Sequence, residues 1–209
     1  MSTQFRIVTV CAANVCRSPL LREILSRELA PLGPIVTIAS AGIYARDGDA
    51  MCEAAAEYAH FTSTAQQSSQ VTPSLLAQAD LILTADTSQR AWLARLQPSS
   101  RARTFTVLQA VGLARQISRI MATGSLPLFA PRMPSDQRAR LSWFADELDA
   151  SRGLTEVGEP LDIDDLHGEP DHSSTFRIVD QSARQFAQAL LACAIPQREA
   201  VLGAVKAGR

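Results

Sequence analysis

The feature that most constrains this chain is the segment Cys11-Ala12-Ala13-Asn14-Val15-Cys16-Arg17-Ser18-Pro19. It follows a β-branched run, Phe5 to Val10, that favours a buried strand. Ser18 and Pro19 then suit a helix cap and a first helical position. A loop between a strand and a helix N-terminus carries unpaired backbone N–H groups and the positive end of the helix dipole. The segment therefore predicts an anion-binding cradle.

The side chains of this loop suit a particular chemistry. A cysteine at the mouth of such a cradle exists partly as a nucleophilic thiolate. Arg17, separated from Cys11 by five residues, can hold two phosphoryl oxygens through its planar fork. Asn14 tolerates the left-handed backbone that a tight loop needs. The alternative is that Cys11 is only a small buried residue, but its place between a strand and a capped helix favours the reactive role.

The first half of the chain alternates strand and helix patterns, which indicates a parallel sheet with helices on both faces. We expect a three-layer α/β/α fold around a central four-stranded sheet. The expected strands are Phe5–Val10, Ile35–Ala39, Leu81–Ala85 and Arg103–Val107, and the expected helices are one opened by Ser18 and Pro19, then Ala50–Tyr58, Val71–Ala79 and Ser88–Leu96.

The alternation of strand and helix patterns ends after Val107. Two amphipathic helices are expected at Leu108–Met121 and Gln137–Asp149, and a long closing helix at His172 or Ser173 to about Cys193. We expect a single domain over residues 1–209, with a helical insertion at about 108–159 and a flexible tail at 196–209.

Composition narrows the function. The net charge of -1 argues against nucleic-acid binding and against an anionic membrane surface. No run reaches the roughly 20 apolar residues that span a bilayer, and the first residues do not resemble a signal peptide, so we expect a cytoplasmic protein. Four cysteines and three histidines show no zinc-type spacing, so no metal is expected.

The segment from Cys11 to Pro19 resembles the signature of low-molecular-weight protein tyrosine phosphatases, Cys-x-Gly-Asn-x-Cys-Arg-Ser-Pro. The resemblance extends over residues 4 to 107 and again over roughly 160 to 194. One departure is Ala13, where the family has glycine; alanine fits only if the local φ is negative. The resemblance implies the phosphotyrosine phosphatase I-like fold, phosphotyrosine proteins as substrates and no cofactor.

The resemblance also implies roles for the residues of the loop. Cys11 is the nucleophile, and Arg17 holds phosphate together with the backbone of Ala12, Ala13, Asn14, Val15 and Cys16. Ser18 hydrogen-bonds the thiolate. Ser40, in Ser40-Ala41-Gly42, is implied to support the loop as the family's matching serine does; the alternative is a simple strand-ending turn. Cys16 is expected to form a protective disulfide with Cys11 on oxidation; alternatively it is merely packed.

The family's general acid lies in a late loop that matches Asp162-Ile163-Asp164-Asp165-Leu166-His167-Gly168. Counting from either end places the acid at Asp165, with Asp164 as the rival. His167 replaces an aromatic residue that would flank the substrate ring, or adds a group that titrates near neutral pH. The alternative is an acidic solvated loop without chemistry.

Two further departures matter. The family often carries a histidine and an arginine in a run that matches Gln66 to Thr72, and both are missing here, which puts the bracing of the loop in doubt. Members of the family are usually shorter, and the extra residues of this chain lie between Val107 and about Glu159. The helices expected there could form a lid, a partner surface or a dimer contact, or could be structural decoration without a function of their own.

Three other functions remain open. A protein arginine phosphatase shares the loop, but that subgroup tends to carry threonine where this chain has Val15. An arsenate reductase needs cysteines placed as a relay, and Cys52 and Cys193 are expected in separate helices. A phosphotyrosine-binding module without activity is the non-enzyme alternative. The oligomeric state is left undecided.

Overall fold

The computed structural model describes residues 3–60, 67–123, 133–154, 160–166, 168–169 and 171–195. Its centre is a four-stranded parallel sheet in the order β2-β1-β3-β4. The strands are β1 (Phe5–Cys11), β2 (Val36–Gly42), β3 (Leu81–Thr84) and β4 (Thr104–Thr106). The predicted fold class and the four-stranded parallel sheet are confirmed.

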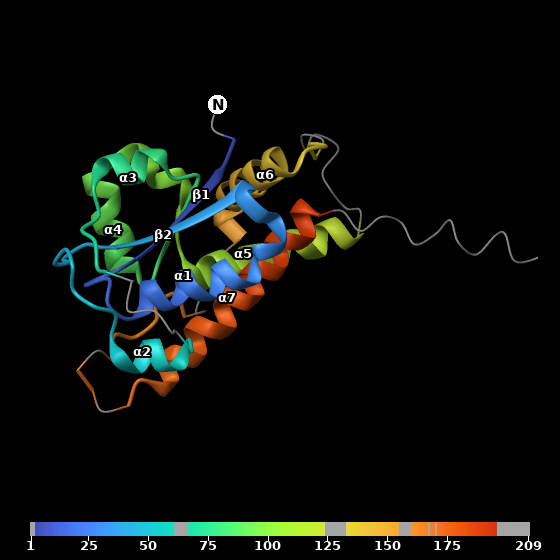
Figure 1. The fold of residues 1–209 in the computed structure, drawn as a ribbon. Helices are drawn as coiled ribbons and strands as arrows, with labels where there is room; N and C mark the ends of the chain where they lie inside the picture. Colours follow the sequence, from blue (N-terminus) through green and yellow to red (C-terminus); the bar gives the residue numbers. More distant parts are fainter. Residues whose placement is uncertain are drawn as a thin grey trace, which may run out of the picture.

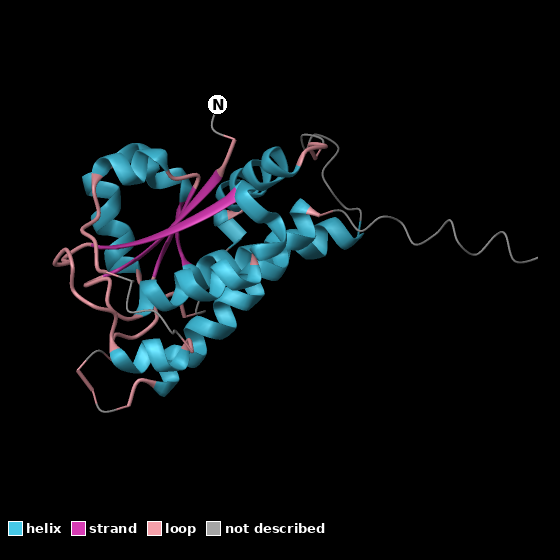
Figure 2. Ribbon diagram, in the orientation of Figure 1, coloured by secondary structure: helices cyan, strands magenta, loops and turns pink. Residues whose placement is uncertain are grey.

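Helices cover both faces of the sheet (Figures 1 and 2). One face packs on α1 (Arg17–Glu28), α5 (Val107–Thr123), α6 (Gln137–Ala150) and α7 (Ser173–Ala194), and the other on α3 (Pro73–Gln78) and α4 (Thr87–Leu96). The short helix α2 (Glu53–Tyr58) lies beside the start of α7. Three 3-10 turns complete the described elements: η1 (Ala30–Ile35), η2 (Pro98–Arg103) and η3 (Arg152–Leu154).

The alternation of side chains along β1 explains the two layers. Phe5 and Ile7 point into the core beneath α1 and α7, whereas Val8 and Val10 point into the smaller core beneath α3 and α4. All four are buried. A strand buried on both faces is rich in apolar residues on each face, which is why the sequence indicated β1 clearly.

The start of α1 differs from the expectation. The helix begins at Arg17, and its N-cap residue is Cys16, whose side chain caps nothing. Ser18 therefore lies inside the first turn and is not the cap. Its hydroxyl is instead directed to Cys11 and to the carbonyl of Ala41, so this residue serves the loop rather than the helix end.

Among the helices after β4, α6 reaches the end of the sheet opposite Cys11. Phe144 of α6 stacks edge-on against Phe186 of α7, with ring centroids 6.2 Å apart. Arg138 donates from Nη2 to Oδ1 of Asp80 at 2.7 Å, just before β3, and lies over the ring of Phe5 at the start of β1. Because these contacts are made at the amino ends of the strands, α6 is placed as a covering layer and not as a lid over Cys11.

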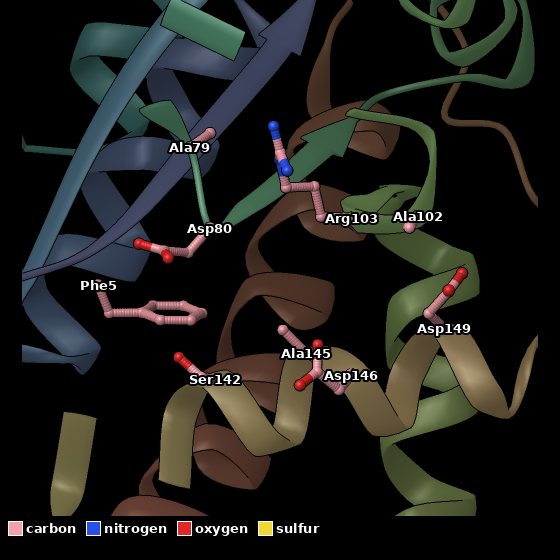
Figure 3. Close-up of a pocket in the computed structure, with 9 residues that line it drawn as sticks. All are labelled: Phe5, Ala79, Asp80, Ala102, Arg103, Ser142, Ala145, Asp146 and Asp149. Carbon is pink, nitrogen blue, oxygen red and sulfur yellow. The ribbon is translucent and has the colours of Figure 1, made fainter. Parts of the chain in front are cut away.

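A cavity of about 230 Å³ separates α6 from the same strand ends (Figure 3). Phe5, Asp80 and Arg103 line one wall, and Ser142, Asp146 and Asp149 line the other. Ligands of parallel α/β sheets bind at the carboxyl ends of the strands, and this cavity lies at the amino ends. It is therefore separate from the site described below.

Among the described residues, no helix is long and apolar enough to cross a membrane. The predicted tail at 196–209 lies outside the described residues, and so does most of the stretch between α5 and α6.

Candidate active site

The loop from Cys11 to Arg17 connects the carboxyl end of β1 to the start of α1, as predicted. Asn14, at its midpoint, is fully buried and has a φ of 58°. Its side chain makes two hydrogen bonds: Nδ2 donates to the hydroxyl of Ser18 at 2.9 Å, and Oδ1 accepts from the N–H of Ser69 at 2.9 Å. Asparagine therefore supplies both the left-handed backbone and the brace that holds it there.

Ala13 is not among the residues of positive φ. Alanine therefore replaces the family's usual glycine at this position without left-handed strain.

The thiol of Cys11 receives a directed hydrogen bond. Ser18 Oγ lies 3.0 Å from Cys11 Sγ and itself accepts the bond from Asn14. The main chain of Ser18 is fixed in turn, because Thr9 Oγ1 donates to its carbonyl at 2.8 Å. This chain of buried bonds directs a hydrogen-bond donor at the sulfur.

The carbonyl groups of the loop are satisfied from outside. The carbonyls of Cys11 and Ala12 accept from the N–H groups of Ile43 and Tyr44 at 3.1 and 2.9 Å, and that of Ala13 accepts from Ser68 Oγ at 2.7 Å. With these carbonyls bonded to other segments, we expect the N–H groups of the loop to face its centre. This is the arrangement that binds an anion.

The end of β2 approaches the loop closely at Gly42. A Cβ added there would lie 2.6 Å from the Ala12 carbonyl oxygen and 2.8 Å from the Asn14 nitrogen. Only glycine leaves room for the loop at this distance. Together with Ser68 and Ser69, this segment replaces the bracing that the missing histidine and arginine had put in doubt.

Arg17 is buried and closes the loop. Nη1 donates to the carbonyl of Ile163 at 2.8 Å and lies 3.5 Å from Asp86 Oδ2, while Nη2 pairs with Asp165 Oδ2. Nε is buried and has no hydrogen-bond partner among the described residues. A buried donor without a partner is costly, so the guanidinium retains one N–H that an anion in the loop can satisfy.

The stretch 160–166 brings Asp165 to the mouth of the loop. Asp162 accepts from the N–H and the hydroxyl of Thr87, and the N–H of Ile163 donates to the Ala85 carbonyl at 2.9 Å. These bonds fix the stretch to the carboxyl end of β3. The Asp165 side chain is 45% exposed while it pairs with Arg17. Asp164 is exposed, and its backbone carbonyl accepts from Thr175.

Cys16 is buried beneath the loop. Burial, and then the nearby thiol of Cys52, raise the pKa of the Cys16 thiol far above its usual range. All four cysteines are free thiols. One expectation about them was wrong: Cys52 is the N-cap residue of α2, outside the helix, and lies beside Cys16 although the two are far apart in sequence. Cys193 lies in α7, as expected.

Two other predicted residues have different outcomes. Ser40 lies in β2 opposite Thr9, two residues before the close approach of Gly42. The support that the end of β2 gives to the loop comes through the Ala41 carbonyl and through Gly42, so the role of Ser40 stays a prediction. His167 lies outside the described residues.

Sequence reasoning missed Tyr44. Its backbone N–H donates to the Ala12 carbonyl of the loop. The residue is 69% exposed, and its ring lies edge-on to Trp92 with centroids 6.3 Å apart. An exposed aromatic ring beside an anion cradle offers a surface for a substrate ring. The signal in the sequence was a lone tyrosine just after Ser40-Ala41-Gly42.

Comparisons with known proteins agree with this geometry. A family model described as low molecular weight phosphotyrosine protein phosphatase matches residues 6–118. The probable low molecular weight protein-tyrosine-phosphatase EpsP of Ralstonia nicotianae is 34% identical over 102 residues, which are 47% of this chain and 68% of that protein. Wzb of Salmonella typhi is 36% identical over 101 residues, 47% of this chain and 65% of Wzb. The matches thus span about two thirds of each relative.

Solved structures share the fold. A YwlE arginine phosphatase with a phosphorylated active-site serine superposes with a TM-score of 0.62 at 19% identity, over 89% of this chain and 95% of that one. The tyrosine phosphatase Wzb of Escherichia coli K30 with sulphate gives 0.59 at 19% identity, over 88% and 97%. The family match covers more than half of the chain and includes the whole of the loop from Cys11 to Arg17. The chain therefore belongs to the low molecular weight phosphotyrosine protein phosphatase family.

Proposed function

We propose that this protein hydrolyses phosphotyrosine in proteins through a phosphocysteine intermediate, with Cys11 as nucleophile, Arg17 as phosphate ligand and Asp165 as general acid. The observation that carries the proposal is the convergence on one loop of three groups: a thiol bonded to Ser18, a buried guanidinium with an unsatisfied Nε, and a carboxylate paired with that guanidinium.

The first step uses these groups together. The Cys11 thiolate attacks phosphorus in line, and the bond between phosphorus and the phenolic oxygen breaks. Arg17 Nε and Nη2 and the N–H groups of residues 12–16 hold the equatorial oxygens, where charge spreads in a loose transition state. The Asp165 carboxyl gives its proton to the departing phenolic oxygen. Tyrosine leaves with that proton, and the phosphoryl group stays on Cys11.

The second step returns the enzyme to its starting state. Asp165, now a carboxylate, takes a proton from a water molecule that attacks phosphorus, and phosphate leaves as the sulfur–phosphorus bond breaks. The hydrogen bond from Ser18 stabilises the departing thiolate. In the described structure Asp165 pairs with Arg17 Nη2. An entering phosphoryl group competes for that donor and so turns the carboxyl towards the leaving oxygen.

The surroundings of the loop favour an aromatic substrate. The exposed ring of Tyr44 stands beside the loop, where it can pack against a phenyl ring of the substrate. Val15 supplies an aliphatic side chain in the loop and is buried. The proposal includes a cytoplasmic location and phosphoprotein substrates. It does not include binding to nucleic acid or to a membrane.

The test compares three peptides of one sequence that carry phosphotyrosine, phosphoarginine or phosphoserine. We expect kcat/KM to be highest for phosphotyrosine, and turnover to vanish in Cys11→Ser while Cys193→Ser, a matched cysteine change in α7, keeps it. A preference for phosphoarginine would instead assign the protein to the arginine phosphatases. Tight binding of phosphotyrosine by the wild type without turnover would identify a binding module instead. Arsenate-dependent loss of thiols would indicate a reductase.

A further inference from the structure

A group of metal-binding side-chain types lies beside the loop from Cys11 to Arg17, which we call the phosphate loop. The group consists of Cys16, Cys52 and His172, which we call the thiol–imidazole cluster. The two sulfur atoms and one ring nitrogen all lie within 4.8 Å of one another. The three residues come from segments that are far apart in the chain, so their spacing in the sequence gave no metal-binding signal. The proposed phosphatase mechanism uses neither Cys52 nor His172.

Each member of the cluster stands immediately before a helix. Cys16 is the N-cap residue of α1, Cys52 that of α2 and His172 that of α7. None of the three side chains caps its own helix. They turn instead towards one another, where α2 lies beside the start of α7 (Figure 1).

The cluster is held in place by its neighbours. The N–H of Cys52 donates to the Val15 carbonyl at 2.7 Å, which fixes Cys52 against the residue that precedes Cys16. The His172 ring packs edge-on against Phe176, with centroids 5.4 Å apart, and its Nδ1 lies 3.8 Å from Cys52 Sγ. A donor set fixed in this way loses little conformational entropy on binding a ligand.

These donors and distances suit one class of ligand. Thiolate and imidazole are the ligands that zinc prefers, at about 2.3 Å for sulfur and about 2.0–2.1 Å for nitrogen. A tetrahedron with such bonds has edges of roughly 3.5–3.8 Å, and the sulfur–nitrogen distance of 3.8 Å already lies at that limit. Two thiolates also balance the charge of a divalent ion in this buried place.

We propose that Cys16, Cys52 and His172 form a binding site for zinc, with a fourth position left to water. The half-buried side chains of Cys52 and His172 give the ion access from solvent. Bound zinc would fasten the phosphate loop to α2 and α7, and it would occupy the Cys16 sulfur.

Cobalt is the probe for the first test, because tetrahedral thiolate–cobalt sites absorb both in the near ultraviolet and in the visible. The full-length chain is reduced, stripped with a chelator and titrated with Co²⁺. We expect one Co²⁺ per chain with both absorptions, and displacement by an equivalent of Zn²⁺. Cys52→Ser and His172→Ala should weaken binding more than about tenfold. Cys193→Ser, the matched cysteine change, should bind as the wild type does.

Cys11→Ser separates this site from the phosphatase site. It should abolish turnover and keep the cobalt spectrum, so the two proposals can fail independently. Melting in the apo form checks that each variant folds, and Zn²⁺ should raise the melting temperature of the wild type but not of Cys52→Ser. Loss of the spectrum in Cys11→Ser, its persistence in Cys52→Ser, or its absence from the folded wild type would each overturn the proposal.

Discussion

Replacing Gly42 by alanine tests whether the end of β2 sets the shape of the phosphate loop. The added Cβ would meet three backbone atoms, at 2.6 Å (Ala12 oxygen), 2.8 Å (Asn14 nitrogen) and 2.9 Å (Ala13 carbon). Backbone atoms cannot rotate away as a side-chain end can. Ordinary contact begins at 3.4 Å, so the loop must retreat by about 0.8 Å at its closest point.

That displacement gives the expected magnitudes. A misplacement of about 1 Å in a reacting group can cost about 100-fold in rate, which corresponds to about 2.7 kcal/mol of lost transition-state stabilisation. Forcing extra volume into a packed site costs about 1–3 kcal/mol of folding stability. We therefore expect Gly42→Ala to fold with a lowered melting temperature and to lose about 100-fold in kcat/KM.

The assay is steady-state hydrolysis of an aryl phosphate, together with thermal melting. Gly153→Ala is the matched control, because a Cβ at Gly153 meets nothing within 4 Å. It should keep the activity and the melting temperature of the wild type. If Gly42→Ala kept the wild-type kcat/KM, the close approach of β2 would not determine the geometry of the loop, and the reasoning would be refuted.

Three further predictions concern the loop and its acid. Asp165→Asn should lower kcat by about 10²–10⁴-fold and flatten the limb of the pH–rate profile that reports the acid, whereas Asp164→Asn, one residue away, should leave both nearly unchanged; the reverse result would move the acid to Asp164. Ser18→Ala removes a hydrogen bond to a charged sulfur, worth about 1.5–3 kcal/mol, so stopped-flow traces should show breakdown of the intermediate slowed about 10–100-fold; an unchanged rate would contradict the role given to this hydroxyl. Burial raises the pKa of the Cys16 thiol, so Cys16 should react slowly with iodoacetamide at neutral pH. After brief treatment, mass spectrometry should find Cys11 alkylated well before Cys16. Equal labelling of the two cysteines would contradict the raised pKa of Cys16.

The sheet was predictable because β1, β3 and β4 are largely buried and helical patterns separate the strands in the sequence. The runs beginning at Phe5 and Leu81 are rich in β-branched and other apolar residues, and the structure confirms them as β1 and β3. The phosphate loop was also predictable, since the order of its residues alone places a thiol and a guanidinium around a helix N-terminus. The contacts that hold this loop were not predictable, because Ser68 and Ser69 are distant in sequence and carry no motif.

Ser18 and Cys52 were misjudged because a local sequence pattern contains no information about tertiary contacts. Ser18 is of a residue type that often caps helices, but the helix starts at Arg17, two residues before the expected start at Pro19. The Ser18 hydroxyl is bonded to Cys11 instead. Cys52 seemed remote from the loop because only its position in the chain was visible. The hydrogen bond from the Cys52 N–H to the Val15 carbonyl holds Cys52 against the loop. In both cases tertiary contacts decide the role of the side chain.

The measurement that tests the central claim most directly is rapid acid quenching of the enzyme during turnover of an aryl phosphate, followed by mass spectrometry of the peptide that contains Cys11. The account predicts one phosphoryl group on the Cys11 sulfur of the wild type, a larger trapped fraction in Ser18→Ala, and none on sulfur in Cys11→Ser. A phosphoryl group on another residue, or turnover in Cys11→Ser with no trapped intermediate, would contradict the assignment of Cys11 as the nucleophile.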